Sequence, residues 1–323
     1  MGDRARDAVR DAAQRRPGAA ALIAGDASLT WAELDDRVTS AARRLCGLVG
    51  AGGERVAIVL GNTVDFAVVY YGALRAGLVV VPLNPGYTAD ELSFALSDSG
   101  AALVVADRPA HDRLRSASAI VVPPDLGSGL ERDLPDVSDD RLAVLLYTSG
   151  TSGRPKGAML THAALAANHD QLDRIEPAVI GPDDVVLLTV PLFHAYGLNT
   201  GLGMVAHHAA TGVLVDRFDP ADSLDLIARH GVTVTVGVPG IYAAWSREPA
   251  AGTALAGVRS AVCGAAPLDE ADAARFAAVT GRTVIIGYGL TECAPVLTTT
   301  AVSDLAKSGS IGRPLPGVSL RLR

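Results

Sequence analysis

Short apolar runs rich in β-branched residues recur along this chain and alternate with amphipathic helical patterns. The clearest runs are ERVAIVL at 54–60, LVVVPLN at 78–84 and AALVVAD at 101–107, with helical periodicity over 64–76 and 88–99 between them. Runs of this kind suit strands buried on both faces, and strands joined by helical crossovers pair in parallel. The alternation therefore predicts an α/β protein with a doubly wound, mainly parallel sheet.

The alternation begins with a predicted helix at 31–48 and continues beyond residue 140. A further helix is predicted at 161–173, and further strands at 142–148, 184–191, 210–215, 232–239, 258–264 and 283–289. Residues 108–140 are richer in Pro, Asp and Ser, so we interpret them as a connection between lobes rather than as core. Since 323 residues exceed the usual size of a single core, we predict two subdomains, 1–140 and 141–310.

Charge and cysteine content restrict the class of protein. The net charge of −7 comes without a basic run that could follow a phosphate backbone, which argues against a nucleic-acid partner. Cys46, Cys263 and Cys293 lie far apart and lack the spacing of a disulfide or metal motif. The N-terminus has no signal-peptide core, and no apolar stretch reaches the roughly 18 residues of a transmembrane segment. We therefore expect a cytoplasmic protein.

One glycine-rich segment, YTSGTSGRPKG at 147–157, follows a predicted strand and precedes the predicted helix at 161–173. Its glycines permit close backbone approach, its hydroxyls can donate to phosphate oxygens, and Lys156 adds positive charge. It is not a Walker A loop, because Pro155 and Gly157 stand where that motif needs Gly and Ser or Thr. The segment predicts a polyphosphate-binding loop, with an ordinary flexible surface loop as the alternative.

Motifs along nearly the whole chain resemble the adenylate-forming (AMP-binding) superfamily, which includes acyl-CoA synthetases, peptide-synthetase adenylation domains and luciferases. Besides the loop, in which Ser152 replaces the usual Thr, the motifs are LTWAELDDRV at 29–38, ALRAGLVVVPLNP at 73–85, VPLFHAYGL at 190–198, CGAAPL at 263–268 and GYGLTEC at 287–293. The resemblance is to the large N-terminal domain of acyl-CoA synthetase-like members.

The resemblance implies two doubly wound, mainly parallel-sheet subdomains, layered α/β/α/β/α, and a partial distorted β-barrel. Residues 311–323 would begin the barrel, with GVSLRLR at 317–323 as a truncated strand. Family members continue into a ribose-binding Asp, a hinge and a mobile C-terminal domain with a catalytic lysine. We therefore expect that domain to be absent and the chain to be incomplete as an enzyme.

Nucleotide-binding residues follow from the matching motifs. They are Thr148, Ser149, Gly150, Thr151, Ser152, Gly153, Lys156, Gly264, Ala265, Ala266, Gly287, Tyr288, Gly289 and Thr291. Tyr288 would cover adenine and Thr291 would bind the α-phosphate, while the small residues at 264–266 would lie against the base. Glu292 would bind Mg²⁺, which combines carboxylates with substrate phosphates. The structural alternatives are a core position for Tyr288, a solvated carboxylate for Glu292 and tight packing for 264–266.

The resemblance further implies four catalytic residues, Lys156, His194, Thr291 and Glu292. Lys156 would offset the charge that develops on departing pyrophosphate. His194 would flank the carboxylate of the acyl substrate, although a lone His after an apolar strand is more often structural.

The acyl pocket expected from the resemblance is small or apolar apart from one tyrosine. Its residues are Ala195, Tyr196, Gly197, Gly237, Val238, Gly240 and Gly287. Residues 232–242 contain no carboxylate that could hold an α-ammonium group, which disfavours an amino acid. Malonate would call for an Arg facing its second carboxylate. No Arg precedes Tyr288 directly, although Arg217 and Arg282 stay open. A fatty or aryl monocarboxylic acid fits better.

The implied reaction is an acid–thiol ligation in two steps. The acid carboxylate attacks the α-phosphorus of ATP to give acyl-AMP, and a thiol then captures the acyl group. The first step needs positioning and charge stabilisation rather than a general base, because the carboxylate is already ionised. The cofactors would be ATP and Mg²⁺, and the acceptor CoA or the phosphopantetheine of an acyl carrier protein. A non-catalytic nucleotide- or partner-binding module is the alternative.

Overall fold

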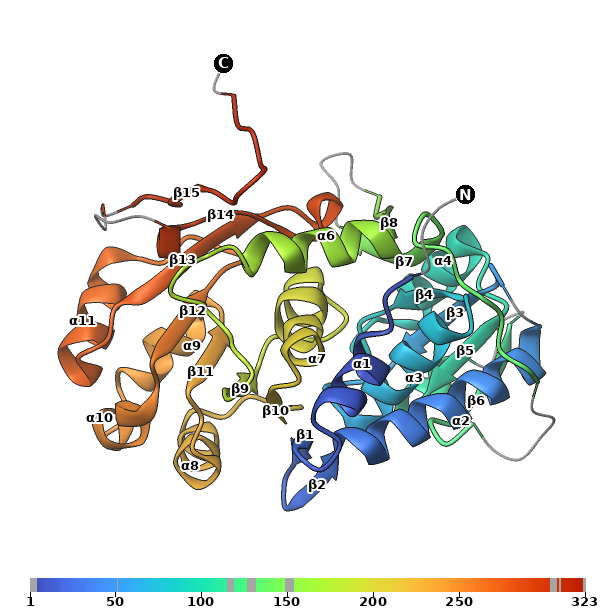
Figure 1. The fold of residues 1–323 in the computed structure, drawn as a ribbon, viewed down its shortest axis with the longest axis horizontal. Helices are drawn as coiled ribbons and strands as arrows, with labels where there is room; N and C mark the ends of the chain where they lie inside the picture. Colours follow the sequence, from blue (N-terminus) through green and yellow to red (C-terminus); the bar gives the residue numbers. More distant parts are fainter. Residues whose placement is uncertain are drawn as a thin grey trace. The chain divides into compact units, whose positions relative to one another are not determined.

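The computed structural model describes residues 5–50, 52–114, 119–126, 132–148, 154–302, 307 and 309–321 (Figure 1). They group into two compact units. Unit 1 takes its residues from Met1–Gly18, Thr30–Ala166 and Leu192–His194, and unit 2 from Ala19–Leu29, Ala167–Pro191 and Ala195–Arg323. The chain therefore passes between the units more than once. The predicted boundary at residue 140 does not coincide with the boundaries of these two units. That residues 1–140 and 141–310 are separate functional domains stays a prediction.

Unit 1 is built on a six-stranded sheet in the order β6-β5-β3-β4-β7-β8. Its strands are β3 (Arg55–Val59), β4 (Val79–Pro82), β5 (Leu103–Ala106), β6 (Ile120–Val122), β7 (Leu142–Thr148) and β8 (Lys156–Thr161). All neighbours pair in parallel except β7 and β8, which are antiparallel. The four strands predicted in this region are confirmed. Strand β8 was not predicted, and it separates the glycine-rich loop from the following helix.

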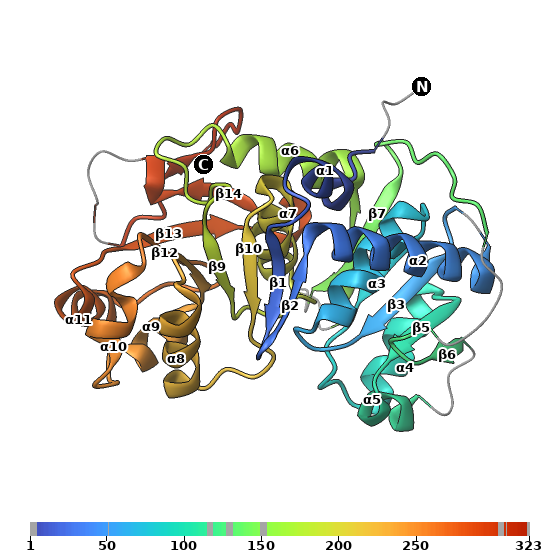
Figure 2. The ribbon, with the colours of Figure 1, turned by 60° about the horizontal axis from the view of Figure 1, so that its bottom comes forward.

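Helices cover both faces of this sheet. They are α1 (Ala8–Arg15), α2 (Trp31–Val49), α3 (Val64–Arg75), α4 (Ala89–Ser99) and α5 (Arg108–Arg113), while α6 (His162–Leu172) crosses the boundary between the units. Ala57 and Val59 pack with Leu92 of α4 and Ala110 of α5 in one core cluster. Helices α2 and α3, which pack against each other, lie on the opposite face (Figure 2).

The interpretation of residues 108–140 as a connection outside the core is wrong for their first part. These residues contain α5 and β6, and Ala110 and Leu114 are buried in the core cluster. The Asp107 carboxylate accepts from the backbone N–H of Ala110, and Pro109 stands in the first turn. Asp and Pro at these positions are typical of a helix start. The composition that suggests a linker here marks the N-terminus of a short helix.

Unit 2 is built on a nine-stranded sheet in the order β15-β14-β13-β12-β11-β9-β10-β1-β2. Its strands are β1 (Ala20–Ala24), β2 (Ala27–Thr30), β9 (Val185–Leu188), β10 (Thr211–Leu214), β11 (Val234–Gly237), β12 (Ser260–Cys263), β13 (Val284–Gly289), β14 (Val296–Thr299) and β15 (Arg313–Pro314). Neighbours from β13 to β1 are parallel, whereas the β13–β14 and β14–β15 pairs are antiparallel. The strands predicted between 184 and 289 are confirmed. The prediction of a strand at 317–323 is wrong, because the described residues 317–321 form no strand. The described part of the chain also contains no closed barrel.

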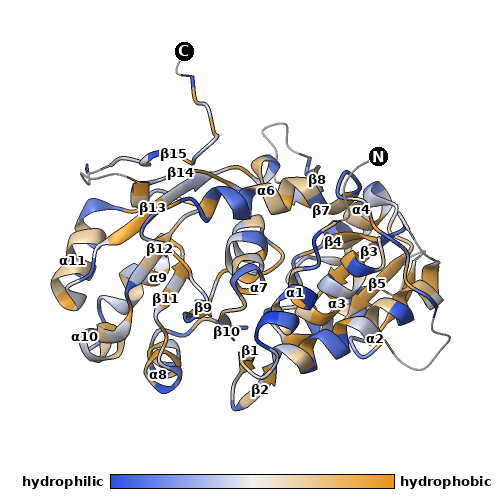
Figure 3. Ribbon diagram, viewed as in Figure 1, coloured by the Kyte–Doolittle hydropathy of each residue, from blue (hydrophilic) through white to orange (hydrophobic). Residues whose placement is uncertain are grey.

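The helices of unit 2 also lie on both faces of its sheet. They are the π-helix η1 (Tyr196–Gly203), α7 (Met204–His208), α8 (Pro220–His230), α9 (Pro239–Trp245), α10 (Ala251–Ala254) and α11 (Glu270–Thr280), with 3₁₀ turns η2 (Leu255–Gly257), η3 (Thr291–Cys293) and η4 (Thr300–Val302). Leu187 packs with Trp245 and Phe276 on one face. Leu188 instead approaches Gly201 of η1. Successive strand residues point to opposite faces, so this sheet is doubly wound as predicted. Strand β13 is accordingly mainly apolar, whereas the edge strand β15 is not (Figure 3).

Candidate active site

The predicted phosphate loop joins β7 to β8 in unit 1. Thr148 and Lys156, which flank the loop, face each other across the antiparallel pair. Lys156 is exposed, so its ammonium group is accessible to a ligand. Ser149, Gly150, Thr151, Ser152 and Gly153, the other predicted phosphate contacts, lie outside the described residues.

The end of β7 is fixed from both sides just before the loop. The hydroxyl of Tyr147 donates to Oδ2 of Asp98 on α4 at 2.6 Å. Desolvation and this carboxylate raise the pKa of Tyr147, so the phenol keeps its proton at neutral pH. On β8, a Cβ at Gly157 would lie 2.8 Å from the side chain of Leu145. Glycine at 157 therefore permits the close pairing that places Lys156 opposite Thr148.

His194 lies in a short segment that also belongs to unit 1. The backbone N–H of Leu192 donates to Oδ1 of the buried Asn62 at 2.8 Å, which ties this segment to the residues that follow β3. The His194 side chain is exposed, yet partial desolvation lowers its pKa. The imidazole is therefore neutral at pH 7 and can either donate or accept a hydrogen bond.

In unit 2, the CGAAPL and GYGLTEC motifs meet at the carboxyl ends of two neighbouring strands. Cys263 of β12 pairs with Ile286 of β13 in a parallel register. Residues 264–266 therefore leave β12 beside residues 287–289, the last residues of β13, at the edge at which open α/β sheets bind ligands. Ala265 and Ala266 are exposed, and Tyr288 is 41% exposed, which excludes a core role for this tyrosine. A planar base can lie on this ring beside two small side chains.

The turn after β12 packs tightly against the ring of Tyr196. A Cβ at Gly264 would lie 3.2 Å from the ring of Tyr196, whose hydroxyl donates to the carbonyl of Val262 at 3.2 Å. Ala265 adopts a φ of +67°, a region that costs energy for a residue with a side chain. Packing on Tyr196 and the strained Ala265 together fix the course of this turn.

Thr291 and Glu292 follow β13 in the short turn η3. The backbone N–H of Leu290 donates to the carbonyl of Pro295, and that of Cys293 to the carbonyl of Leu290, both at 2.9 Å. Glu292 is exposed and makes no ion pair with any described residue, so its carboxylate is available. A free carboxylate beside a threonine hydroxyl is an oxygen donor set that fits Mg²⁺.

Sequence reasoning missed the buried side chains that hold this turn. Asn199 of η1 donates to the carbonyl of Ala294 at 2.7 Å. Asn168 of α6 donates to the carbonyl of Val296 at 2.9 Å and accepts from its N–H at 3.2 Å. His169 lies beside them, with Nε2 at 3.1 Å from the carbonyl of Asn199. In the sequence, the only indication of these buried contacts is Asn168, a poor helix former within the predicted helix at 161–173.

Part of the expected acyl pocket also lies along this sheet edge. Gly237 ends β11, and its carbonyl accepts from the N–H of Gly264 at 3.2 Å. Gly287 follows on β13. Arg282 precedes the other end of β13 and donates to the carbonyl of Ala256 at 3.2 Å. Arg282 is therefore directed away from the edge that carries the motifs.

Two doubly wound sheets, with the CGAAPL and GYGLTEC motifs at one carboxyl edge, agree with the fold that the motifs predict. The model of the family described as AMP-binding enzyme matches residues 9–323, and the chain belongs to this family. Within the described residues, none of the helices combines the length and the apolar character needed to cross a bilayer.

The relatives of the chain are named as CoA ligases. It is 35% identical to a feruloyl-CoA synthase of Amycolatopsis sp over 321 residues, which cover 96% of this chain and 64% of the relative. It is 30% identical to a long-chain-fatty-acid–CoA ligase of Yersinia pestis, covering 91% of this chain and 61% of that protein. Among solved structures, ATP-bound MatB from Rhodopseudomonas palustris superposes with a TM-score of 0.88 at 30% identity, covering 98% of this chain and 66% of that one. The chain thus spans about two thirds of the length of these proteins.

Proposed function

We propose that this chain belongs to an acyl-CoA ligase and binds the two substrates, ATP and a carboxylic acid, from which the acyl-adenylate forms. The observation that carries the proposal is the shared carboxyl edge of β12 and β13, where residues 264–266 follow β12, Tyr288 lies near the end of β13 and Glu292 follows it. The names of the relatives support the same reaction class.

Each proposed site residue has a separate role. Tyr288 covers the adenine, and Thr291 hydrogen-bonds the α-phosphate. Glu292 holds Mg²⁺, which offsets phosphate charge when bound. The substrate carboxylate attacks the α-phosphorus and pyrophosphate leaves, with Lys156 stabilising the leaving group. The roles predicted from the motifs are phosphate contacts for residues 148–153 and a contact with the acyl carboxylate for His194.

We further propose a fatty or aryl monocarboxylic acid as the substrate. No carboxylate occurs at 232–242 to hold an α-ammonium group, and Arg282 is directed elsewhere. The thiol acceptor is CoA, in line with the names of the relatives, or a carrier-protein phosphopantetheine. Thiol capture is expected to require a C-terminal domain, and the reaction to take place in the cytoplasm.

Acid-dependent exchange of pyrophosphate into ATP tests the proposal. We expect the full-length protein, with its C-terminal domain, to catalyse exchange with ferulate, benzoate or dodecanoate and little with malonate or phenylalanine. Glu292→Gln should abolish most of it, whereas Glu54→Gln, at an exposed carboxylate before β3, should not. Strongest exchange with malonate or an amino acid contradicts the substrate class. Binding of ATP without exchange for any acid favours a nucleotide-binding module.

A further inference from the structure

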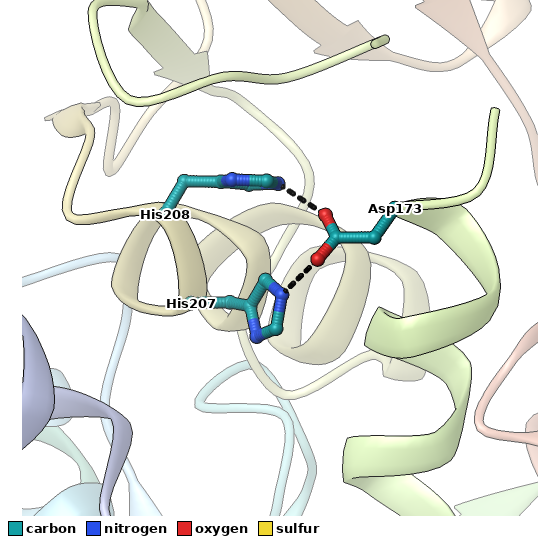
Figure 4. Close-up of side chains that lie close together, drawn as sticks. All are labelled: Asp173, His207 and His208. Atoms are coloured by element: carbon teal, nitrogen blue, oxygen red, sulfur yellow. Dashed lines mark hydrogen bonds and ion pairs between the residues drawn. The ribbon is translucent and has the colours of Figure 1, made fainter. Parts of the chain in front are cut away.

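Three potential metal ligands converge in unit 2, apart from the residues assigned to the nucleotide. Asp173 follows directly after α6, and His207 and His208 form the end of α7. The Nε2 atom of His207 lies 2.7 Å from Oδ2 of Asp173, and the Nε2 atom of His208 lies 2.9 Å from Oδ1 (Figure 4). One ligand atom from each residue lies within 4.8 Å of the others.

The surroundings of the cluster suit an ion that enters from solvent. The Asp173 side chain is 38% exposed, whereas those of His207 and His208 are 12% and 15% exposed. The two imidazole rings are nearly perpendicular, with an interplanar angle of 87°. Because the two histidine side chains are largely buried, their nitrogen atoms are held in place, whereas the more exposed Asp173 carboxylate can rotate.

We propose that Asp173, His207 and His208 form a binding site for a divalent late transition metal ion such as Zn²⁺. Zinc accepts imidazole nitrogen and carboxylate oxygen at roughly 2.0–2.2 Å, and tetrahedral geometry then separates the ligand atoms by about 3.3 Å. The observed separations, 2.7 Å to Oδ2 and 2.9 Å to Oδ1 of Asp173, are each within about half an ångström of that spacing, so a small rotation of the carboxylate brings one of its oxygens and both imidazoles to a single ion. Water fills the fourth position, as in other sites with three protein ligands.

The nitrogen ligands make this site chemically distinct from the one proposed at Glu292. Mg²⁺ prefers oxygen donors, whereas imidazole suits zinc, nickel and copper. A metal here cross-links the ends of α6 and α7. Helix α6 also carries Asn168, which is bonded to Val296, so the ion would stabilise the elements behind the Glu292 turn.

To test the site, the metal-free 323-residue chain is titrated calorimetrically with ZnCl₂, in excess Mg²⁺ and with a phosphine reductant instead of a thiol. We expect one equivalent to bind, and CoCl₂ to give the visible absorption of tetrahedral cobalt. Asp173→Asn and His208→Asn should each weaken binding by about tenfold or more. His111→Asn, at an exposed histidine of α5, should bind as the wild type does.

Thermal unfolding provides a second readout that does not depend on any single variant. Zn²⁺ should raise the midpoint of the wild type and of His111→Asn, and leave that of Asp173→Asn unchanged. Three results overturn the proposal. They are no saturable zinc binding, equal binding by Asp173→Asn and His208→Asn, and thiolate-to-cobalt charge-transfer absorption, which would place the ion on cysteine. The carboxylate would then only pair with the two imidazoles.

Discussion

The side-chain amide of Asn168 forms two hydrogen bonds with the backbone of Val296, 128 residues later in the chain. Asn168 donates to the carbonyl and accepts from the N–H, so one side chain satisfies both polar groups of a buried residue. Val296 begins β14, which pairs with the strand that carries Tyr288. The contact therefore fixes the return of the chain behind Thr291 and Glu292.

Replacing Asn168 by Leu should destabilise the protein by roughly 2–6 kcal/mol, because two buried backbone groups lose their partners at about 1–3 kcal/mol each. Urea denaturation measures the change. ATP affinity should also fall, because the turn that holds Glu292 loses its support. Gln14→Leu, at an exposed amide of α1, is the control and should change neither quantity. Unchanged stability of Asn168→Leu contradicts this role.

Gly289 and Gly240 form a matched pair for testing backbone packing. A Cβ at Gly289 would lie 2.0 Å from the carbonyl oxygen of Pro295, whereas one at Gly240 would meet no atom within 4 Å. Gly289→Ala should cost about 2 kcal/mol or more, and Gly240→Ala should stay within about 0.5 kcal/mol of the wild type. Thermal unfolding of both variants measures the difference. Equal stabilities would show that the Gly289 turn relaxes freely.

His162 should make stability depend on pH. Burial lowers its pKa to about 4, with a further contribution from Arg141 that Asp139 opposes. Its unfolded pKa is about 6.5, so the unfolded chain binds a proton that the folded one excludes. Stability is therefore greatest above the unfolded pKa and falls as pH drops from about 6.5 towards 4. Between pH 7 and pH 5 the loss should be about 2 kcal/mol.

Urea denaturation of the wild type and of His162→Leu at both pH values isolates this contribution. The variant should lose less stability on acidification, by about the same 2 kcal/mol. Parallel losses in the two proteins would mean that His162 takes up its proton in the folded state as readily as in the unfolded one.

The sequence predicted the central strands and long helices well, because their apolar patterns are local. The run at 142–148 and the helix at 31–48 differ from β7 and α2 by at most one residue. Short edge strands such as β15 carry too few residues to show a period. Helix α5 was missed because Asp107 and Pro109 are equally common in linkers and at helix starts.

The candidate site could be predicted only where it is carried by continuous motifs. CGAAPL and GYGLTEC contain the residues at the β12–β13 edge, and the structure adds the parallel register that brings them together. Asn168 and Asn199 act through contacts with residues about 100 positions away, which no local pattern encodes. The pairing of Asp173 with His207 and His208 depends in the same way on where two helices end.

Calorimetric titration of the chain with ATP in the presence of Mg²⁺ tests the nucleotide site at the β12–β13 edge most directly. We expect saturable binding that weakens by about tenfold or more, or about 1.4 kcal/mol, in Tyr288→Ala and in Ala266→Trp. Ala274→Trp, at an exposed position of α11, should bind as the wild type does. No ATP binding by the wild type, or equal affinities in all four proteins, would show that the nucleotide does not bind at this edge.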